Sequence, residues 1–306
     1  MRKRLLNVAA RVAAFLGLAI ARVLPLSVLR RIADVVGGIA YLLLGERRRM
    51  MLEHLAIAFG DDLSPRERRR IAIASLRNLA RTSLEFLKLP ALSPECIRQL
   101  VPLVGMDTLR EQLAGNRGAI VITAHSGNWE YLAARLAAEG LPVNVLAREH
   151  DDAATAALIN RIRRTAGVNV ISKWDLRAAL RCLRRGEILG ILPDQNVAEG
   201  GILADFLGRP ATTFTTPANF ALRTNLPLIP AFGLRLPDGS LRAVVEEPLP
   251  LAQTGDREAD ILTNTRIMND ALSAAIRQHP EQWLWIHRRW KAAPSSPGPT
   301  SPEGIP

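Results

Sequence analysis

The sequence is poor in cysteine and in aromatic side chains. Its 306 residues include only two cysteines, Cys96 and Cys182, which form no CxxC motif. We therefore expect no disulfide framework, and we expect the protein to be in a reducing compartment. Phe, Trp and Tyr make up 5% of the chain, and no nucleic-acid-binding motif is recognisable. The five histidines form no cluster with Cys, Asp or Glu, so we expect no metal site.

Two further absences narrow the functional class. The chain has no GxSxG elbow, because Ser126 lies in HSGN instead, and this argues against a serine hydrolase. It also has no clean run of about 20 uncharged residues, because Arg11 and Arg22 interrupt the first apolar stretch. Arg11 equally splits the apolar region of a would-be signal peptide, which weakens that alternative.

Positive charge is what the sequence has in excess. Its net charge is +11, which implies acidic partners: nucleic acid, an anionic membrane surface or an acidic carrier protein. The first 50 positions hold ten Lys or Arg against Asp34 and Glu46. The apolar, basic region 1–45 predicts helices that associate with a membrane, as an interfacial anchor or a single tilted span. The alternative is a pair of ordinary amphipathic core helices.

Three regions are predicted: the anchor over 1–45, a main domain over 46–291 and a Pro/Ser/Gly-rich, disordered tail over 292–306. The main domain begins with helices. Ser64, Pro65 and Glu67 form a capping box with proline at the first helical position, and the helix they start ends before Pro90. Glu85 lies among apolar neighbours in this helix, and we interpret it as a salt-bridged structural carboxylate.

From about residue 101 the pattern changes to strands alternating with helices. Such alternation predicts an α/β fold with a mostly parallel central sheet flanked by helices. The turn at 236–240 joins two strands directly, so we expect an antiparallel edge. The predicted strands cover 119–124, 143–147, 168–171, 188–192, 227–234 and 241–245, and the predicted helices cover 129–139, 155–165, 176–185, 217–223 and 256–278.

His125 is the first candidate catalytic residue. An apolar run over 119–124 ends at this histidine, and the small residues of a turn follow. A buried strand of this length would deliver His125 to the carboxyl edge of the sheet, where open α/β proteins place ligands. Four residues separate it from Glu130 across the turn, so this carboxylate could fold back onto the imidazole. A histidine held by a carboxylate is the minimal general-base pair.

Other segments add candidates. Asp194, in the segment PDQN after another apolar run, would emerge near His125 or serve as a turn or helix-capping residue. The stretch 206–213 is predicted to be a loop of basic and hydroxyl side chains. Trp283 and Trp285, near the end of the chain, are predicted to pack in the core, with a membrane-interface belt as the alternative.

Six motifs, in the same order as in the family, resemble those of the bacterial late acyltransferases of lipid A synthesis, the lauroyl/myristoyl transferase family. This family belongs to the lysophospholipid acyltransferase superfamily. The resemblance covers about residues 45–291, and its motifs are HSGNWE, Arg148 within LAREH, RIRRTAG at 161–167, PDQN, DFLGRPATT and QWLWIHRRWK. The sequence departs from many family members at Ser126, where those members carry an aromatic residue.

The resemblance implies an enzyme that moves a fatty acyl group from acyl carrier protein, or from acyl-CoA, to a lipid hydroxyl. His125 would be the general base, and Glu130 would orient it. The oxyanion would be stabilised near Asn128 or by an arginine. Arg163 fits best, with Arg148 and Arg164 as competitors. Asp194 would bind or orient the acceptor. No metal or cofactor is implied beyond the acyl thioester.

The implied partners are acyl carrier protein, a lipid A precursor or related glycolipid as acceptor, and anionic lipids of the bacterial inner membrane. The implied location is the cytoplasmic face of that membrane, and no nucleic acid is involved. Two alternatives stay open. One is acylation of another lipid, such as a lysophospholipid, an aminolipid or a phosphoglycolipid. The other is a non-catalytic basic protein that only binds membranes, which would need the charge but not the His125 pair.

Overall fold

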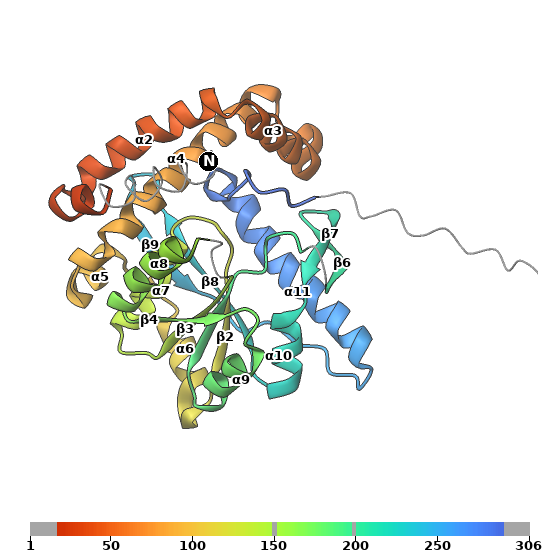
Figure 1. The fold of residues 1–306 in the computed structure, drawn as a ribbon. Helices are drawn as coiled ribbons and strands as arrows, with labels where there is room; N and C mark the ends of the chain where they lie inside the picture. The colour runs from red at the N-terminus through yellow and green to blue at the C-terminus, as the bar shows by residue number, and fades with distance from the viewer. Residues whose placement is uncertain (1–16, 149–151, 198–199, 291–306) are drawn as a thin grey trace, which may run out of the picture.

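The computed structural model describes residues 17–148, 152–197 and 200–290. Two parts of the sequence predictions lie outside these residues: the start of the basic region, 1–16, and the tail from 292. Within the described residues, the predicted α/β architecture is confirmed (Figure 1). A seven-stranded sheet in the order β1-β9-β8-β2-β5-β3-β4 forms the centre, and a separate hairpin, β6-β7, lies beside it.

The sheet is parallel except at one pair of strands. Strands β8, β2, β5, β3 and β4 are all parallel to their neighbours in this order, and β1 is parallel to β9. Strands β8 and β9 run antiparallel, as the turn at 236–240 predicted. The short strand β1 then extends the sheet beyond β9. The strands are β1 (Leu103–Val104), β2 (Ala119–Ile122), β3 (Val143–Ala147), β4 (Val168–Ser172), β5 (Ile188–Ile191), β8 (Leu228–Arg235) and β9 (Leu241–Val245).

The central strand β2 explains why its sequence is an unbroken apolar run. Ile120 and Ile122 belong to one buried cluster, while Ala119 and Val121 belong to another on the opposite face. A strand buried on both faces has no polar side to alternate with. Helices α5 (Pro94–Leu100), α6 (Met106–Leu113), α7 (Trp129–Ala138) and α8 (Ala153–Thr165) cover one face, and α9 (Leu176–Arg184), α10 (Thr216–Thr224) and α11 (Arg257–Gln278) cover the other.

The N-terminal helices lie across one end of this sandwich (Figure 1). Residues 17–23 are helical and are followed by α2 (Leu26–Leu43), α3 (Gly45–Phe59) and α4 (Pro65–Lys88). The capping box of Ser64 and Glu67 is confirmed at the start of α4. Across the described ranges, no helix combines the length and the apolar character that a bilayer crossing requires.

One predicted loop is wrong. Residues 206–213 belong instead to the hairpin of β6 (Gly201–Phe206) and β7 (Arg209–Phe214). Leu207 and Gly208 connect the strands with φ of 52° and 80°, the left-handed conformations that a two-residue hairpin turn requires. Leucine is unusual in such a turn, and its buried side chain keeps it there. The sequence signal was therefore absent.

Candidate functional site

The turn after β2 places His125 at the carboxyl edge of the sheet, as predicted. Gly127 has a φ of +60°, and a Cβ at this position would overlap the carbonyl oxygen of Gly233 on β8. The N–H group of Asn128 donates to that same carbonyl at 2.6 Å. Glycine thus lets the turn lie directly on the sheet backbone. Asn128 then caps α7, its side chain accepting from the Tyr131 N–H at 2.9 Å.

Asp194, and not Glu130, holds the imidazole. Its Oδ1 lies 2.8 Å from His125 Nδ1, and its Oδ2 accepts from the His125 backbone N–H at 2.8 Å. The two residues meet because β2 and β5 are parallel neighbours with Ile122 opposite Ile191. Each functional residue follows its strand by the same three positions. The predicted nearness of Asp194 to His125 is confirmed.

Asp194 is almost fully buried, with 1% of its surface exposed. Its Oδ2 also accepts from Trp283 Nε1 at 2.8 Å. Burial by itself would raise the pKa of the carboxyl, but its contacts with His125 and Trp283 outweigh burial and keep that pKa below the ordinary value. An ionised carboxylate only accepts hydrogen bonds, so Nδ1 of His125 carries a proton, and in the neutral tautomer of the ring the lone pair is on Nε2.

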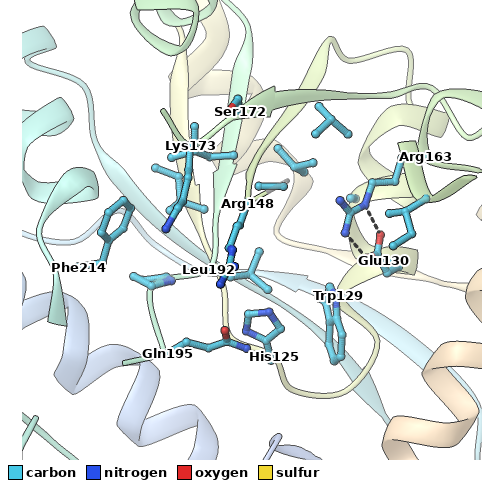
Figure 2. Close-up of a pocket in the computed structure, with 18 of the residues that line it drawn as sticks. His125, Trp129, Glu130, Arg148, Arg163, Ser172, Lys173, Leu192, Gln195 and Phe214 are labelled. Atoms are coloured by element: carbon cyan, nitrogen blue, oxygen red, sulfur yellow. Dashed lines mark hydrogen bonds and ion pairs between the residues drawn. The ribbon is translucent and has the colours of Figure 1, made fainter. Parts of the chain in front are cut away.

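His125 forms part of the wall of a cavity of about 590 Å³ (Figure 2). The cavity opens at the carboxyl ends of β3, β4 and β5, between α7 and α8. Its lining combines apolar side chains with a few cations, the mixture expected for an acyl chain joined to a polar group. The apolar lining includes Ala133, Val145, Leu146, Ile159, Val170 and Phe214, and the cations are Arg148, Arg163 and Lys173.

The prediction that Glu130 folds back onto His125 is wrong. Glu130 forms a two-pronged ion pair with Arg163, at 2.6 Å and 3.0 Å, drawn as dashed lines in Figure 2. Among the described residues, no hydrogen bond or ion pair joins Glu130 to His125. Glu130 lies in the first turn of α7 and faces α8, whose Arg163 offers the planar pair of donors that fits a carboxylate. The pair lines the same cavity as His125.

The remaining predicted residues divide into two groups. Arg148 and Arg163 line the cavity, as Figure 2 shows. Arg164 is exposed, does not line it, and donates to the Asn160 carbonyl at 3.3 Å. Asn128 is fully buried and its side chain donates to Glu85, away from the cavity. Its backbone N–H is occupied by Gly233. Arg164 and Asn128 therefore do not fit the predicted oxyanion role.

Two residues of the site were not predicted as functional. Trp283 packs in the core as expected, being 1% exposed, but it also donates to Asp194. His287 lines the cavity, and its Nε2 accepts from the Asn196 N–H at 2.9 Å. Burial, reinforced by nearby positive groups and partly opposed by Asp194, lowers the pKa of His287 to about 4. Both residues lie in the segment QWLWIH, and nothing in that segment indicated which strands of the sheet it would pack against.

The segment at 282–287 also covers the turn that carries His125. The Leu284 N–H donates to the His125 carbonyl at 3.0 Å, and the Gly127 N–H donates to the Gln282 carbonyl at 3.2 Å. The site is thus held by chain segments about 160 residues apart. No group of three or more His, Cys, Asp or Glu side chains within the described residues is arranged to hold a metal ion.

The sequence of the chain matches known proteins over nearly its whole length. The family model for bacterial lipid A biosynthesis acyltransferases matches residues 2–292. The chain belongs to the bacterial lipid A biosynthesis acyltransferase family. It is therefore an acyltransferase, as the motifs predicted. The alternative of a non-catalytic protein that only binds membranes is wrong.

Individual relatives cover nearly the whole acyltransferase. It is 24% identical to the lipid A biosynthesis lauroyltransferase of Escherichia coli K12, over 92% of this chain and 89% of the relative. It is 26% identical to a lipid A biosynthesis acyltransferase of Haemophilus influenzae, over 94% and 92%. A phosphatidylinositol mannoside acyltransferase of Mycolicibacterium smegmatis is 22% identical over 72% of each chain. The relatives thus include acyltransferases with different lipid acceptors in their names.

Proposed function

We propose that the enzyme transfers a fatty acyl group from the thioester of acyl carrier protein to a hydroxyl group of a lipid A precursor, with His125 as general base. The observation that carries this proposal is the contact between His125 and Asp194 at the wall of a cavity lined by both apolar and polar side chains. The acyl thioester is the only co-substrate that the reaction needs, and no metal or other cofactor takes part.

The reaction follows from the protonation state of the dyad. His125 Nε2 takes the proton of the acceptor hydroxyl as its oxygen attacks the thioester carbonyl. Asp194 stabilises the imidazolium that forms and holds the ring in one orientation. The tetrahedral intermediate collapses to an ester, and the departing thiolate recovers the proton from the imidazolium. Arg148 and Arg163, which line the cavity, supply positive charge for the oxyanion.

Glu130 has a different task in this mechanism from the one that the sequence suggested. Its ion pair with Arg163 fixes the guanidinium at the cavity wall. The pair also raises the pKa of Arg163, against the lowering effect of burial. We assign Glu130 as the residue that positions Arg163, and Asp194 as the residue that positions His125.

The donor is proposed to be a carrier protein because a basic helix, α9, starts shortly after the residues that line the cavity at the end of β4. Ser172 and Lys173 line the cavity at the end of β4, and α9 starts at Leu176. Arg177, Arg181 and Arg184 are exposed along one face of α9. In the part of the chain that the structure describes, none of the three forms an ion pair. A row of unpaired cations suits an acidic protein surface.

The acceptor is proposed to arrive from the cytoplasmic face of the inner membrane, with α2 lying peripherally on the lipid. The outer face of α2 exposes seven large apolar side chains, while Leu29, Ala33 and Tyr41 face inward. Exposed arginines, including Arg31, Arg47 and Arg49, flank this face. An apolar face bordered by cations suits an anionic leaflet. The seven are Val28, Ile32, Val35, Val36, Ile39, Leu42 and Leu43.

A second acceptor class is favoured by a specific similarity. The match to phosphatidylinositol mannoside acyltransferases covers 72% of this chain, so a phosphoglycolipid acceptor is the alternative that the test includes. It would use the same dyad and the same cavity, with a different headgroup outside.

The test measures transfer of a labelled acyl group. Purified enzyme receives the label on acyl carrier protein or on CoA, with a lipid A precursor or a mannosylated phosphoinositide in mixed vesicles. We expect the carrier protein to be the better donor and the lipid A precursor to gain the label. His125→Ala should abolish transfer. Undiminished transfer by the folded His125→Ala protein would overturn the mechanism, and label on the phosphoinositide alone would select the second acceptor.

A further inference from the structure

A fully buried carboxylate behind the catalytic turn has no place in the reaction described so far. Glu85 of α4 is 0% exposed and receives hydrogen bonds from three side chains on three different elements. Arg30 of α2 donates at 2.6 Å, Arg235 of β8 at 2.7 Å and 3.0 Å, and Asn128 at 2.7 Å. Glu85 therefore joins α2, the sheet and the catalytic turn at one point.

The charge of Glu85 is maintained by these partners. Burial alone would raise its pKa, yet the hydrogen bonds and charges of Arg235 and Arg30 outweigh burial and lower it. A buried charge depends strongly on every partner that compensates it. The removal of one partner should therefore change how tightly the carboxylate holds the others.

Asn128 connects Glu85 to the reacting groups. Its Nδ2 donates to Glu85, while its Oδ1 caps α7 by accepting from the Tyr131 N–H. It stands three residues after His125 and two before Glu130. The orientation of this one amide thus fixes the start of α7 between the base and the carboxylate that holds Arg163.

The face of α4 that carries Glu85 also contacts the turn after β2 at Gly127. Thr82 Oγ1 and Asn78 Nδ2 both donate to the Gly127 carbonyl, at 2.8 Å and 3.0 Å. Both residues are buried, and with Glu85 they lie at helical spacing on one side of α4. This helix is therefore a rigid support for the turn, and a support of this kind sets catalytic geometry.

Arg30 brings α2 into the same network. Its side chain is 24% exposed, whereas Glu85 is not exposed at all. The two helices cross closely, because a Cβ at Gly37 of α2 would overlap the backbone of Arg77 on α4. A rigid contact of this kind transmits a displacement of α2 to α4 instead of absorbing it.

We propose that Arg30, Glu85 and Asn128 form a positioning relay that couples the seating of α2 on a lipid surface to the geometry of the turn carrying His125. The relay rests on the proposed membrane role of α2. None of its members contacts a reacting atom, so they act through His125 and Arg163. The enzyme would then be fully organised only where its lipid acceptor is found.

A second ion pair between the same helices provides a matched control. Arg81 of α4 binds Asp34 of α2 through two hydrogen bonds, at 2.6 Å and 2.7 Å, with exposure similar to that of Arg30. Among the described residues, neither Arg81 nor Asp34 has a hydrogen bond to the turn. Loss of this pair should weaken the α2–α4 contact without reaching the site.

The experiment compares Arg30→Gln, Arg30→Lys and Arg81→Gln with the wild type. Thermal unfolding is measured first, and all rates are then compared at a temperature where every variant is folded, because Arg30→Gln, which faces the buried Glu85, should lose more stability than Arg81→Gln, whose partner Asp34 is partly exposed. Transfer from acyl carrier protein is then measured with the acceptor in anionic vesicles. We expect Arg30→Gln to lower kcat about tenfold with little change in KM for the donor, because misplaced groups lower the rate more than binding. Arg81→Gln should keep kcat within about twofold, and Arg30→Lys should recover part of the loss.

Hydrogen exchange gives a readout that does not depend on catalysis. Amides of residues 126–131 should exchange more slowly when the wild type binds anionic vesicles without acceptor, and Arg30→Gln should lose this protection while Arg81→Gln keeps it. Equal effects of the two glutamine variants on kcat and on exchange would overturn the relay. Absence of transfer by the wild type would instead count against the proposed function and leave the exchange result to decide the relay.

Discussion

Asp194 Oδ1 lies 2.8 Å from His125 Nδ1, and Trp283 Nε1 lies 2.8 Å from the other oxygen of the same carboxylate. This arrangement fixes both the tautomer and the orientation of the imidazole. His125, the proposed general base, therefore has its Nε2 free of Asp194 at the cavity wall, and the carboxylate of Glu130 binds Arg163. Asp194 thus holds His125, and Glu130 holds Arg163.

Asp194→Asn should leave the fold intact and reduce kcat by about 10²- to 10⁴-fold, because a neutral amide no longer stabilises the imidazolium or enforces the reactive tautomer. Label transfer under saturating donor measures the effect, and circular dichroism checks the fold. Asp194→Glu is the companion variant, which keeps the charge but not the distance. An Asp194→Asn enzyme with near wild-type kcat would exclude the dyad.

Glu130→Gln should be less damaging to catalysis than Asp194→Asn. It removes the charge that holds Arg163 and not the one that holds His125. We expect a decrease in kcat/KM of about 10- to 100-fold. Arg163→Gln should cause a similar decrease, and the double variant should be little worse than either single one, since the pair acts as a unit. Arg164→Gln, on the exposed side of the same helix, is the control.

His287 should make stability depend on pH. Its pKa is about 4 in the folded protein against an ordinary value of 6.5. Between these values the unfolded chain binds a proton that the folded chain does not, so the free energy of unfolding falls as the pH drops from 6.5 towards 4. His287→Gln, which can still accept from Asn196, should show a smaller decrease in denaturant titrations across this range. An unchanged slope would contradict the assignment.

The outer face of α2 should govern binding to lipid. Val35→Glu with Leu42→Glu places two carboxylates on this face, where the side chains are 62% and 66% exposed. We expect weaker sedimentation with anionic vesicles and an unchanged melting temperature, because neither side chain is in the core. The matched control adds the same two charges outside α2, as Val104→Glu with Leu203→Glu, at positions that are 53% and 57% exposed. Equal loss of binding in the control would point to net charge alone.

The arginines of α9 should affect binding of the acyl donor and not binding of the lipid acceptor. The triple change Arg177→Glu, Arg181→Glu and Arg184→Glu is expected to raise KM for acyl carrier protein at least about tenfold, with little change in kcat. The effect should shrink as salt is added, because it depends on exposed charges. The acyl-CoA reaction serves as the control, and an equal rise in its KM would show that the change acts on the cavity itself.

Much of the fold could be predicted because its signals are local. Six of the seven strands of the sheet and the helices between them lie within a few residues of the predicted ranges. Apolar runs mark strands buried on both faces, and the capping box of Ser64 marks the start of α4. The β6-β7 hairpin was missed because its turn, at Leu207 and Gly208, is stabilised by burial of the leucine and not by a typical turn sequence.

The site could be predicted only in part. His125 and Asp194 both follow apolar strands, so the sequence placed them at one edge of the sheet. It did not indicate that their strands are neighbours in matching register, and the nearer carboxylate in sequence, Glu130, was chosen instead. Strand order depends on how the crossover helices pack, which a single sequence does not record.

By itself, the sequence determined the alternation of strands and helices, the turn that ends at α7, the basic charge and the family, because each of these depends on residues close together in the chain or on ordered motifs. Only the tertiary structure decided which carboxylate meets His125, where Glu130 points, and that Trp283 and Glu85 belong to the site. These are contacts between segments from about 30 to 150 residues apart, and packing brings their side chains within hydrogen-bond distance.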